Sequence, residues 1–188
     1  MSLPNLISLA RLLSVPLVVW AILAGKMELA FWVFVAAGIS DAVDGFIAKH
    51  FGAASALGKY LDPLADKALL VGVYVTLGHA SYLPTWLVIL VVFREVIIIG
   101  GAILILMLTE AAMIETLRIS KVNTAAQIIL AAVVLAIAAM ELKEGDLPLV
   151  QIYLAWGLTY LVAVTTFLSG AAYLVKWGRK ADSMEDSL

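Results

Sequence analysis

Six stretches of apolar residues alternate with short breaks of polar, glycine and proline residues along the whole chain. The stretches cover residues 5–24, 29–49, 55–79, 84–108, 119–140 and 149–176. Each is close to or longer than the roughly 20 residues with which an α-helix crosses the hydrocarbon core of a bilayer. Helices are expected because, in lipid, the backbone polar groups must be hydrogen-bonded within their own segment. The pattern predicts an all-α, polytopic integral membrane protein with six transmembrane helices.

The composition agrees with this architecture and excludes several classes of protein. Of 188 residues, 64% are hydrophobic and 14% are charged, whereas soluble domains have roughly 45–50% and 25%. These proportions exclude a soluble domain, a disordered chain and a nucleic-acid-binding protein. The chain has no cysteine, which excludes disulfides, thiolate metal sites and a cysteine nucleophile. Because the breaks are short, any chemistry must lie among the helices.

Basic residues are divided unequally between the two ends of the predicted helices. If the N-terminus is cytoplasmic, the opposite side holds only Lys26 and Lys143. The cytoplasmic side then holds Lys49, Lys59, Lys67, Arg118, Lys121, Lys176, Arg179 and Lys180. Since cytoplasmic loops are enriched in Lys and Arg, both termini are expected in the cytoplasm.

The chain is expected to form a single domain over residues 1–180, followed by a disordered acidic tail over residues 181–188. The N-terminus does not have the pattern of a signal or transit peptide. We therefore expect a bacterial inner (cytoplasmic) membrane protein with its active site at the cytoplasmic face.

Four aspartates interrupt the second and third apolar stretches. In the centre of a membrane helix each costs about 2.5–3.5 kcal/mol, so an uncompensated set would be strongly unfavourable. Asp41 and Asp44 are three residues apart, and Asp62 and Asp66 are four apart, so each pair shares a helix face. Since helices joined by a short break run antiparallel, both pairs can lie at one depth. The spacing predicts a cluster of carboxylates in a hydrated pocket.

A cluster of this kind requires cations, and too few basic side chains lie nearby to neutralise it. Carboxylate oxygens favour Mg²⁺ or Mn²⁺, with Ca²⁺ as an alternative. Two ions about 3.5–4 Å apart would suit phosphoryl chemistry. The small residues Gly45, Ala48 and Gly58 lie between the acids, and this arrangement favours a ligand pocket over helix packing alone.

Residues 41–66 resemble the signature of the CDP-alcohol phosphatidyltransferase family, D-x2-D-G-x2-A-R-x8-G-x3-D-x3-D. Every position matches except one, where Lys49 stands in place of the arginine. Within the family the sequence is most similar to cardiolipin synthases of the mitochondrial and related bacterial type, over residues 55–67 and 119–130. Phosphatidylglycerophosphate synthases share the signature and a pair like Arg94-Glu95.

The resemblance implies that an alcohol attacks the β-phosphorus of CDP-diacylglycerol and that CMP leaves. Phosphatidylglycerol is the acceptor in the cardiolipin branch, and glycerol 3-phosphate is the alternative. The resemblance also implies a homodimer. The implied metal ligands are Asp41, Asp44, Asp62 and Asp66, and Asp66 is also the implied general base. The implied CDP-binding residues are Asp44, Gly45, Ala48, Lys49 and Gly58.

Further polar residues have two interpretations each. Arg94 could bind a substrate phosphate or form an internal ion pair with Glu95 or an aspartate of the cluster. Arg11 could hold a substrate phosphate and Lys49 could contact the nucleotide, or either side chain could extend toward the interface. The candidates for binding the acceptor or a phosphate are Asn5, Arg11, Arg94, Arg118 and Lys121. A cation transporter is the alternative of another class, since intramembrane acids also occur there. No internal repeat is visible, which disfavours it.

Overall fold

A computed structural model describes residues 3–51, 58–108, 117–144 and 149–185, and side chains over 8–40, 64–101, 117–141 and 149–177. Within these ranges the chain forms six α-helices and no strand. The helices are α1 (Leu3–Leu23), α2 (Met27–Phe51), α3 (Gly58–His79), α4 (Thr85–Leu108), α5 (Arg118–Glu144) and α6 (Leu149–Glu185). The prediction of an all-α chain with six helices is confirmed.

Most helix ends lie within three residues of the predicted positions, and the largest differences are at the C-terminal ends of α5 and α6. Helix α5 continues to Glu144 and α6 to Glu185. The last turns of α6 therefore include residues 181–185, which the sequence analysis assigned to a separate tail. The domain boundary at residue 180 stays a prediction.

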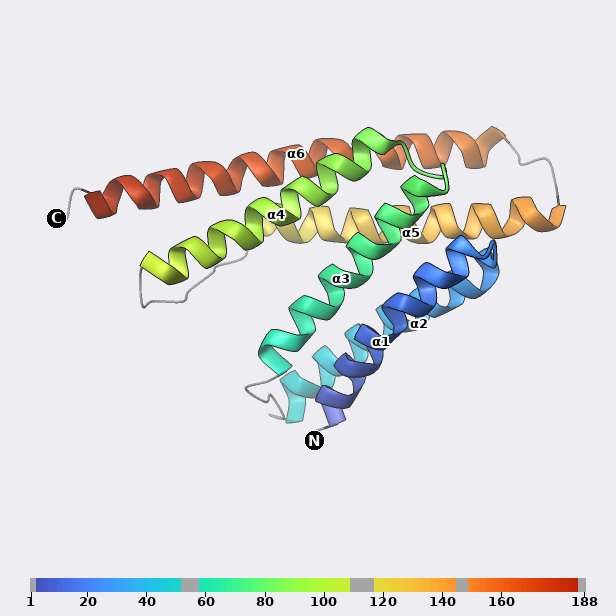
Figure 1. The fold of residues 1–188 in the computed structure, drawn as a ribbon, viewed down its shortest axis with the longest axis horizontal. Coiled ribbons are helices and arrows are strands. Elements are labelled where there is room, and N and C mark those ends of the chain that lie inside the picture. Colours follow the sequence, from blue (N-terminus) through green and yellow to red (C-terminus); the bar gives the residue numbers. More distant parts are fainter. Residues whose placement is uncertain (1–2, 52–57, 109–116, 145–148, 186–188) are drawn as a thin grey trace.

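Successive helices run in opposite directions, so their ends gather on two sides of the fold (Figure 1). The first residues of α1, α3 and α5 and the last residues of α2, α4 and α6 lie toward one side, at the left and the bottom of the view. Helix α1 packs against α2 and α3, α5 against α6 and α2, and α4 against α6 and α3. The helix ends that carry the predicted acids therefore lie on the same side as the start of α5.

The interior is apolar and joins helices that are distant in sequence. Val18, Val73, Leu77, Leu87 and Leu130 come from four helices, and each is fully buried. This core fixes the positions of the helices through close packing, because buried side chains make many simultaneous contacts.

Large apolar side chains also cover much of the outer surface. Trp32, Phe93, Tyr153 and Phe167 are each 60% exposed or more. Extensive exposed apolar surface marks a membrane or protein interaction site. Among the described residues, two segments are long and apolar enough to cross a membrane, Arg118–Glu141 and Leu149–Trp177. The six-span topology and the side of the termini stay predictions.

Helices α3 and α4 approach each other closely at Gly78. A Cβ atom added at this glycine would lie 2.6 Å from Cγ2 of Val88. Valine is confined to one preferred χ1 rotamer in a helix, so this neighbour cannot turn away without strain. The glycine thus permits the close approach at the end of α3.

We predict that Gly78→Ala lowers the stability of the fold by about 1–3 kcal/mol, the usual cost of overpacking a well-packed interior. The measurement is thermal unfolding of the detergent-solubilised protein, followed by tryptophan fluorescence. Gly38→Ala on α2 is the matched control, since nothing lies within 4 Å of its added Cβ. Equal melting temperatures for Gly78→Ala and the unchanged protein would contradict the prediction.

Candidate active site

Asp66 and Arg11 form an ion pair that joins α3 to α1. Nη1 of Arg11 donates a hydrogen bond to Oδ1 of Asp66 at 2.9 Å. The arginine side chain is 1% exposed, whereas the aspartate side chain is 40% exposed. The carboxylate is therefore held from its buried side and remains accessible from the other, which is the arrangement that a proton acceptor for an incoming substrate needs.

The sequence does not predict this pairing. From the sequence, Arg11 is a candidate for holding a substrate phosphate or for extending toward the interface, and Asp66 is a candidate metal ligand and general base. The regular spacing of Asn5, Ser8 and Arg11 places these residues along one side of α1, but spacing does not reveal which helix that side contacts. The burial of Arg11 at 2% exposure shows that it does not extend toward the interface.

The other predicted metal and nucleotide ligands are placed by their backbones only. Asp41 and Asp44 lie in the C-terminal half of α2, and Asp62 lies one turn before Asp66 in α3. The residues whose side chains lie outside the described part are Asn5, Asp41, Asp44, Gly45, Ala48, Lys49, Gly58 and Asp62. Where side chains are described, no group of three or more His, Cys, Asp or Glu residues gathers. The four-carboxylate metal site stays a prediction.

A second charged network begins at the residue that follows Asp66. Nζ of Lys67 on α3 donates to Oε2 of Glu95 on α4. The other carboxylate oxygen of Glu95, Oε1, accepts from Nη1 of Arg94. One buried carboxylate is thus shared by two cations from two helices, and α3 is tied to α4 at the level of the candidate site.

Arg94 extends this network to the last two helices. Its Nη2 donates to Oγ of Ser120 on α5 and to Oγ of Ser169 on α6, the latter at 3.1 Å. Its side chain is 3% exposed. The internal ion pair with Glu95, one of the two interpretations from the sequence, is present. A role of Arg94 in binding a phosphate stays a prediction.

The start of α5 combines exposed basic residues with buried amides. Arg118 and Lys121 are exposed, so both are accessible to an anionic group. Asn123 is fully buried, and its Oδ1 accepts hydrogen bonds from Thr165 at 2.8 Å and Thr166 at 2.9 Å on α6. The buried amide therefore joins α5 to α6.

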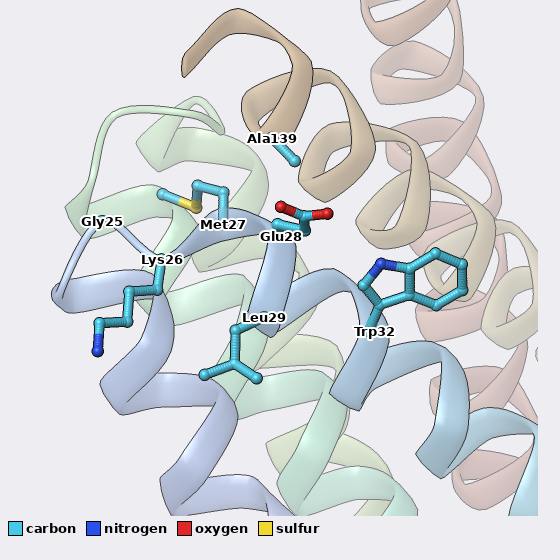
Figure 2. A pocket seen from close by; sticks show the side chains of 7 residues that line it. All are labelled: Gly25, Lys26, Met27, Glu28, Leu29, Trp32 and Ala139. Carbon is cyan, nitrogen blue, oxygen red and sulfur yellow. The ribbon is translucent and has the colours of Figure 1, made fainter. Parts of the chain in front are cut away.

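A pocket lined by described residues lies at the other side of the fold. It has a volume of about 540 Å³ and is formed at the turn between α1 and α2, with Ala139 of α5 on its wall. Figure 2 shows Lys26, Glu28 and Trp32 among its side chains. None of its lining residues was a predicted site residue, and it lies toward the ends of the helices opposite Asp66 (Figure 1).

Comparison with known proteins adds an independent line of information. The profile of the CDP-alcohol phosphatidyltransferase family matches residues 1–168. The chain is 31% identical over 191 residues to a probable cardiolipin synthase (CMP-forming) of Drosophila melanogaster, covering 93% of this chain and 57% of the relative. It is 33% identical over 195 residues to the cardiolipin synthase (CMP-forming) of Rattus norvegicus, covering 95% of this chain and 62% of the relative.

Relatives named for another activity are equally similar. The chain is 34% identical over 194 residues to the chloroplastic CDP-diacylglycerol–glycerol-3-phosphate 3-phosphatidyltransferase 1 of Oryza sativa subsp. japonica, covering 94% of this chain and 57% of the relative. The corresponding relative of Bacillus subtilis is 28% identical over 190 residues, with coverage of 93% and 94%. The chain thus spans less than two thirds of the fly, rice and rat relatives, and nearly all of the bacterial one.

The two membrane-compatible helices and the similarity to lipid synthases indicate a membrane protein. The family profile extends over the signature at residues 41–66, over Arg11 and over the network that Lys67 and Arg94 form with Glu95. The chain belongs to the CDP-alcohol phosphatidyltransferase family of enzymes.

Proposed function

We propose that this chain is a cardiolipin synthase, which transfers the phosphatidyl group of CDP-diacylglycerol to phosphatidylglycerol and releases CMP. The observation that carries the proposal is the family signature over residues 41–66, which ends at a carboxylate held by a buried arginine and 40% exposed. Relatives named as cardiolipin synthases from fly and rat support the choice of acceptor.

A phosphatidylglycerophosphate synthase is the second candidate, with glycerol 3-phosphate as the acceptor. It is favoured by the rice relative at 34% identity and by the Bacillus relative, of which the chain covers 94%. Both candidates share the donor, the signature and the reaction type. They differ only in whether the glycerol phosphate that attacks is part of a lipid.

The donor set of the signature fits a hard divalent metal ion. Carboxylate oxygens are ligands of Mg²⁺ and Mn²⁺, and the residues that would hold two such ions are Asp41, Asp44, Asp62 and Asp66. Without a cation these side chains would repel a diphosphate. When bound, the metal neutralises the negative charge that develops on the diphosphate as the leaving group departs.

In the proposed reaction Asp66 accepts the proton of the acceptor hydroxyl. The hydroxyl oxygen bonds to the β-phosphorus, the bond from that phosphorus to the bridging oxygen breaks, and CMP leaves with that oxygen. Arg11 orients the carboxylate through its 2.9 Å hydrogen bond, so the proton acceptor meets the hydroxyl in one orientation.

The remaining signature residues form the nucleotide pocket in this proposal. Gly45, Ala48 and Gly58 lack large side chains and let the CDP group approach the helix backbones. Lys49 contributes a compact positive charge in place of the planar arginine fork. Arg118 and Lys121, exposed at the start of α5, attract the anionic acceptor.

We further propose that all six helices cross the bilayer, with both termini and the active site at the cytoplasmic face of a bacterial inner membrane. The alternation of helix directions in Figure 1 supports this topology, because it places the ends of α2 and the starts of α3 and α5 on one side. A homodimer is proposed on family membership alone.

The first prediction from this function concerns the acceptor. Purified protein in detergent with Mg²⁺ and CDP-diacylglycerol is given phosphatidylglycerol or glycerol 3-phosphate separately, and CMP and lipid products are measured. We expect CMP and cardiolipin with phosphatidylglycerol, and no CMP once a chelator removes the metal. If product forms only with glycerol 3-phosphate, the second candidate is the function. If no CMP is released with either acceptor, both candidates are contradicted.

The second prediction concerns the proposed base. Asp66→Asn is expected to reduce transfer by about 10²–10⁴-fold, the usual contribution of a general base, while metal-dependent binding of CDP-diacylglycerol stays largely intact. Binding is measured by equilibrium dialysis with labelled donor lipid in detergent. Glu28→Gln, in the first turn of α2 at the other side of the fold, is the matched control and should leave turnover unchanged. Normal turnover in Asp66→Asn would show that Asp66 is not the general base.

The third prediction concerns topology and uses the absence of native cysteine. Single cysteines are introduced at Lys26, in the turn between α1 and α2, and at Arg118, at the start of α5; both positions are exposed. In intact cells with a permeable outer membrane, a membrane-impermeant thiol reagent should label the first cysteine only. The second should be labelled after the inner membrane is opened. Labelling of both in intact cells would show that the proposed topology is wrong.

A further inference from the structure

The network around Glu95 contains more positive than negative charge. Among the residues whose side chains are described, Glu95 is the one carboxylate to which Lys67 and Arg94 donate. The other partners of Arg94 are the neutral hydroxyls of Ser120 and Ser169. Among the described residues, two cations therefore share one carboxylate, which leaves a net charge of one positive unit in a largely buried place.

Uncompensated charge is unfavourable away from water, so this network is suited to receive an anion. Arg94 is the less available of the two cations, because its side chain is 3% exposed and its donors are directed to three helices. The Lys67 side chain is 32% exposed. The ammonium group of Lys67 donates one of its three hydrogens to Glu95. Lys67 is the cation that an incoming anion can reach.

Lys67 also has a specific relation to the proposed base. It follows Asp66 directly, so their Cα atoms are about 3.8 Å apart on one helix. Asp66 contacts Arg11 on α1, and Lys67 contacts Glu95 on α4. The first turns of α3 thus present a carboxylate and an ammonium group side by side, directed toward two different neighbouring helices.

Both candidate acceptors contain one chemical unit that matches this pair. In phosphatidylglycerol and in glycerol 3-phosphate, a three-carbon glycerol carries a phosphate at one end and the reacting hydroxyl at the other. A phosphate held by the ammonium group would place the hydroxyl of the same glycerol beside the neighbouring carboxylate.

We propose that Lys67 binds the phosphate of a glycerol-phosphate acceptor and thereby brings the attacking hydroxyl to Asp66. In the absence of acceptor Glu95 holds the ammonium group, and the acceptor phosphate displaces part of that contact. Glu95 is a positioning residue in this arrangement. The inference rests on the proposed function and adds to it the residue that recognises the acceptor.

The test compares steady-state kinetics of Lys67→Gln with those of the unchanged protein. Loss of one charged hydrogen bond should raise the KM of the acceptor by about tenfold to a hundredfold. The kcat at saturating acceptor and the KM of CDP-diacylglycerol should change by less than about threefold, since neither depends on this contact. Lys67→Arg, which keeps the charge, should restore most of the acceptor affinity.

Lys26→Gln is the matched control, because it removes a lysine from the opposite end of the helices and should change neither KM. Phosphatidylglycerol and glycerol 3-phosphate form separate arms, and the effect should appear with whichever acceptor the unchanged protein uses. A rise in both KM values, or a fall in kcat alone, would overturn the role of Lys67 in acceptor binding.

Failure of the proposed function is distinguishable, since the unchanged protein would then release no CMP with either acceptor. If Lys67→Gln cannot be purified as a folded protein, Lys67→Met, which also removes the charge and keeps the length of the side chain, takes its place. An effect confined to the acceptor KM supports the proposal, and unchanged kinetics or an effect on the donor overturns it.

Discussion

Charged side chains inside an apolar helical bundle must be paired across helices, and this requirement links the fold to the candidate chemistry. Arg11 pairs with Asp66 between α1 and α3, and Lys67 pairs with Glu95 between α3 and α4. Arg94 then connects α4 to α5 and α6 through serine hydroxyls. Helix α3 is the element common to both ion pairs. Breaking either pair would leave a buried or half-buried charge, which is far more costly than losing an exposed salt bridge.

This arrangement explains how a helical bundle can hold reactive groups in place. Each described site residue is carried by a helix whose position is fixed by the apolar core, in which Val73 and Leu77 of α3 are fully buried. Rigid elements position side chains more accurately than loops do. The charges are exposed to different degrees, since Arg11 and Arg94 are buried while Asp66 and Lys67 are partly accessible. The buried members support the accessible ones, which are available to substrates.

The number and approximate bounds of the helices could be predicted from the sequence because each apolar stretch has the length of a membrane helix. The spacing of the acids also showed which of them share a helix face. The lateral contacts could not be predicted, since a helix that is apolar nearly all round has no polar face to reveal its orientation. The Arg11–Asp66 pair and the hydrogen bonds from Thr165 and Thr166 to Asn123 depend on that orientation. The end of α6 was placed too early because residues 177–185 lose the apolar pattern while remaining helical.

Asp66 and Lys67 are consecutive in α3 and contact different helices, α1 and α4. This limits where residues can be inserted into or deleted from α3. Each residue of an α-helix turns the next by about 100°. Inserting or deleting one residue between Asp62 and Asp66 would therefore rotate the two carboxylates relative to each other, although every functional group would still be present. The ion pairs with α1 and α4 hold α3 in place from Asp66 onward. The change of direction would therefore affect Asp62. The four-residue interval is thus a property of helix geometry, and conservative substitutions within it should be tolerated where length changes are not.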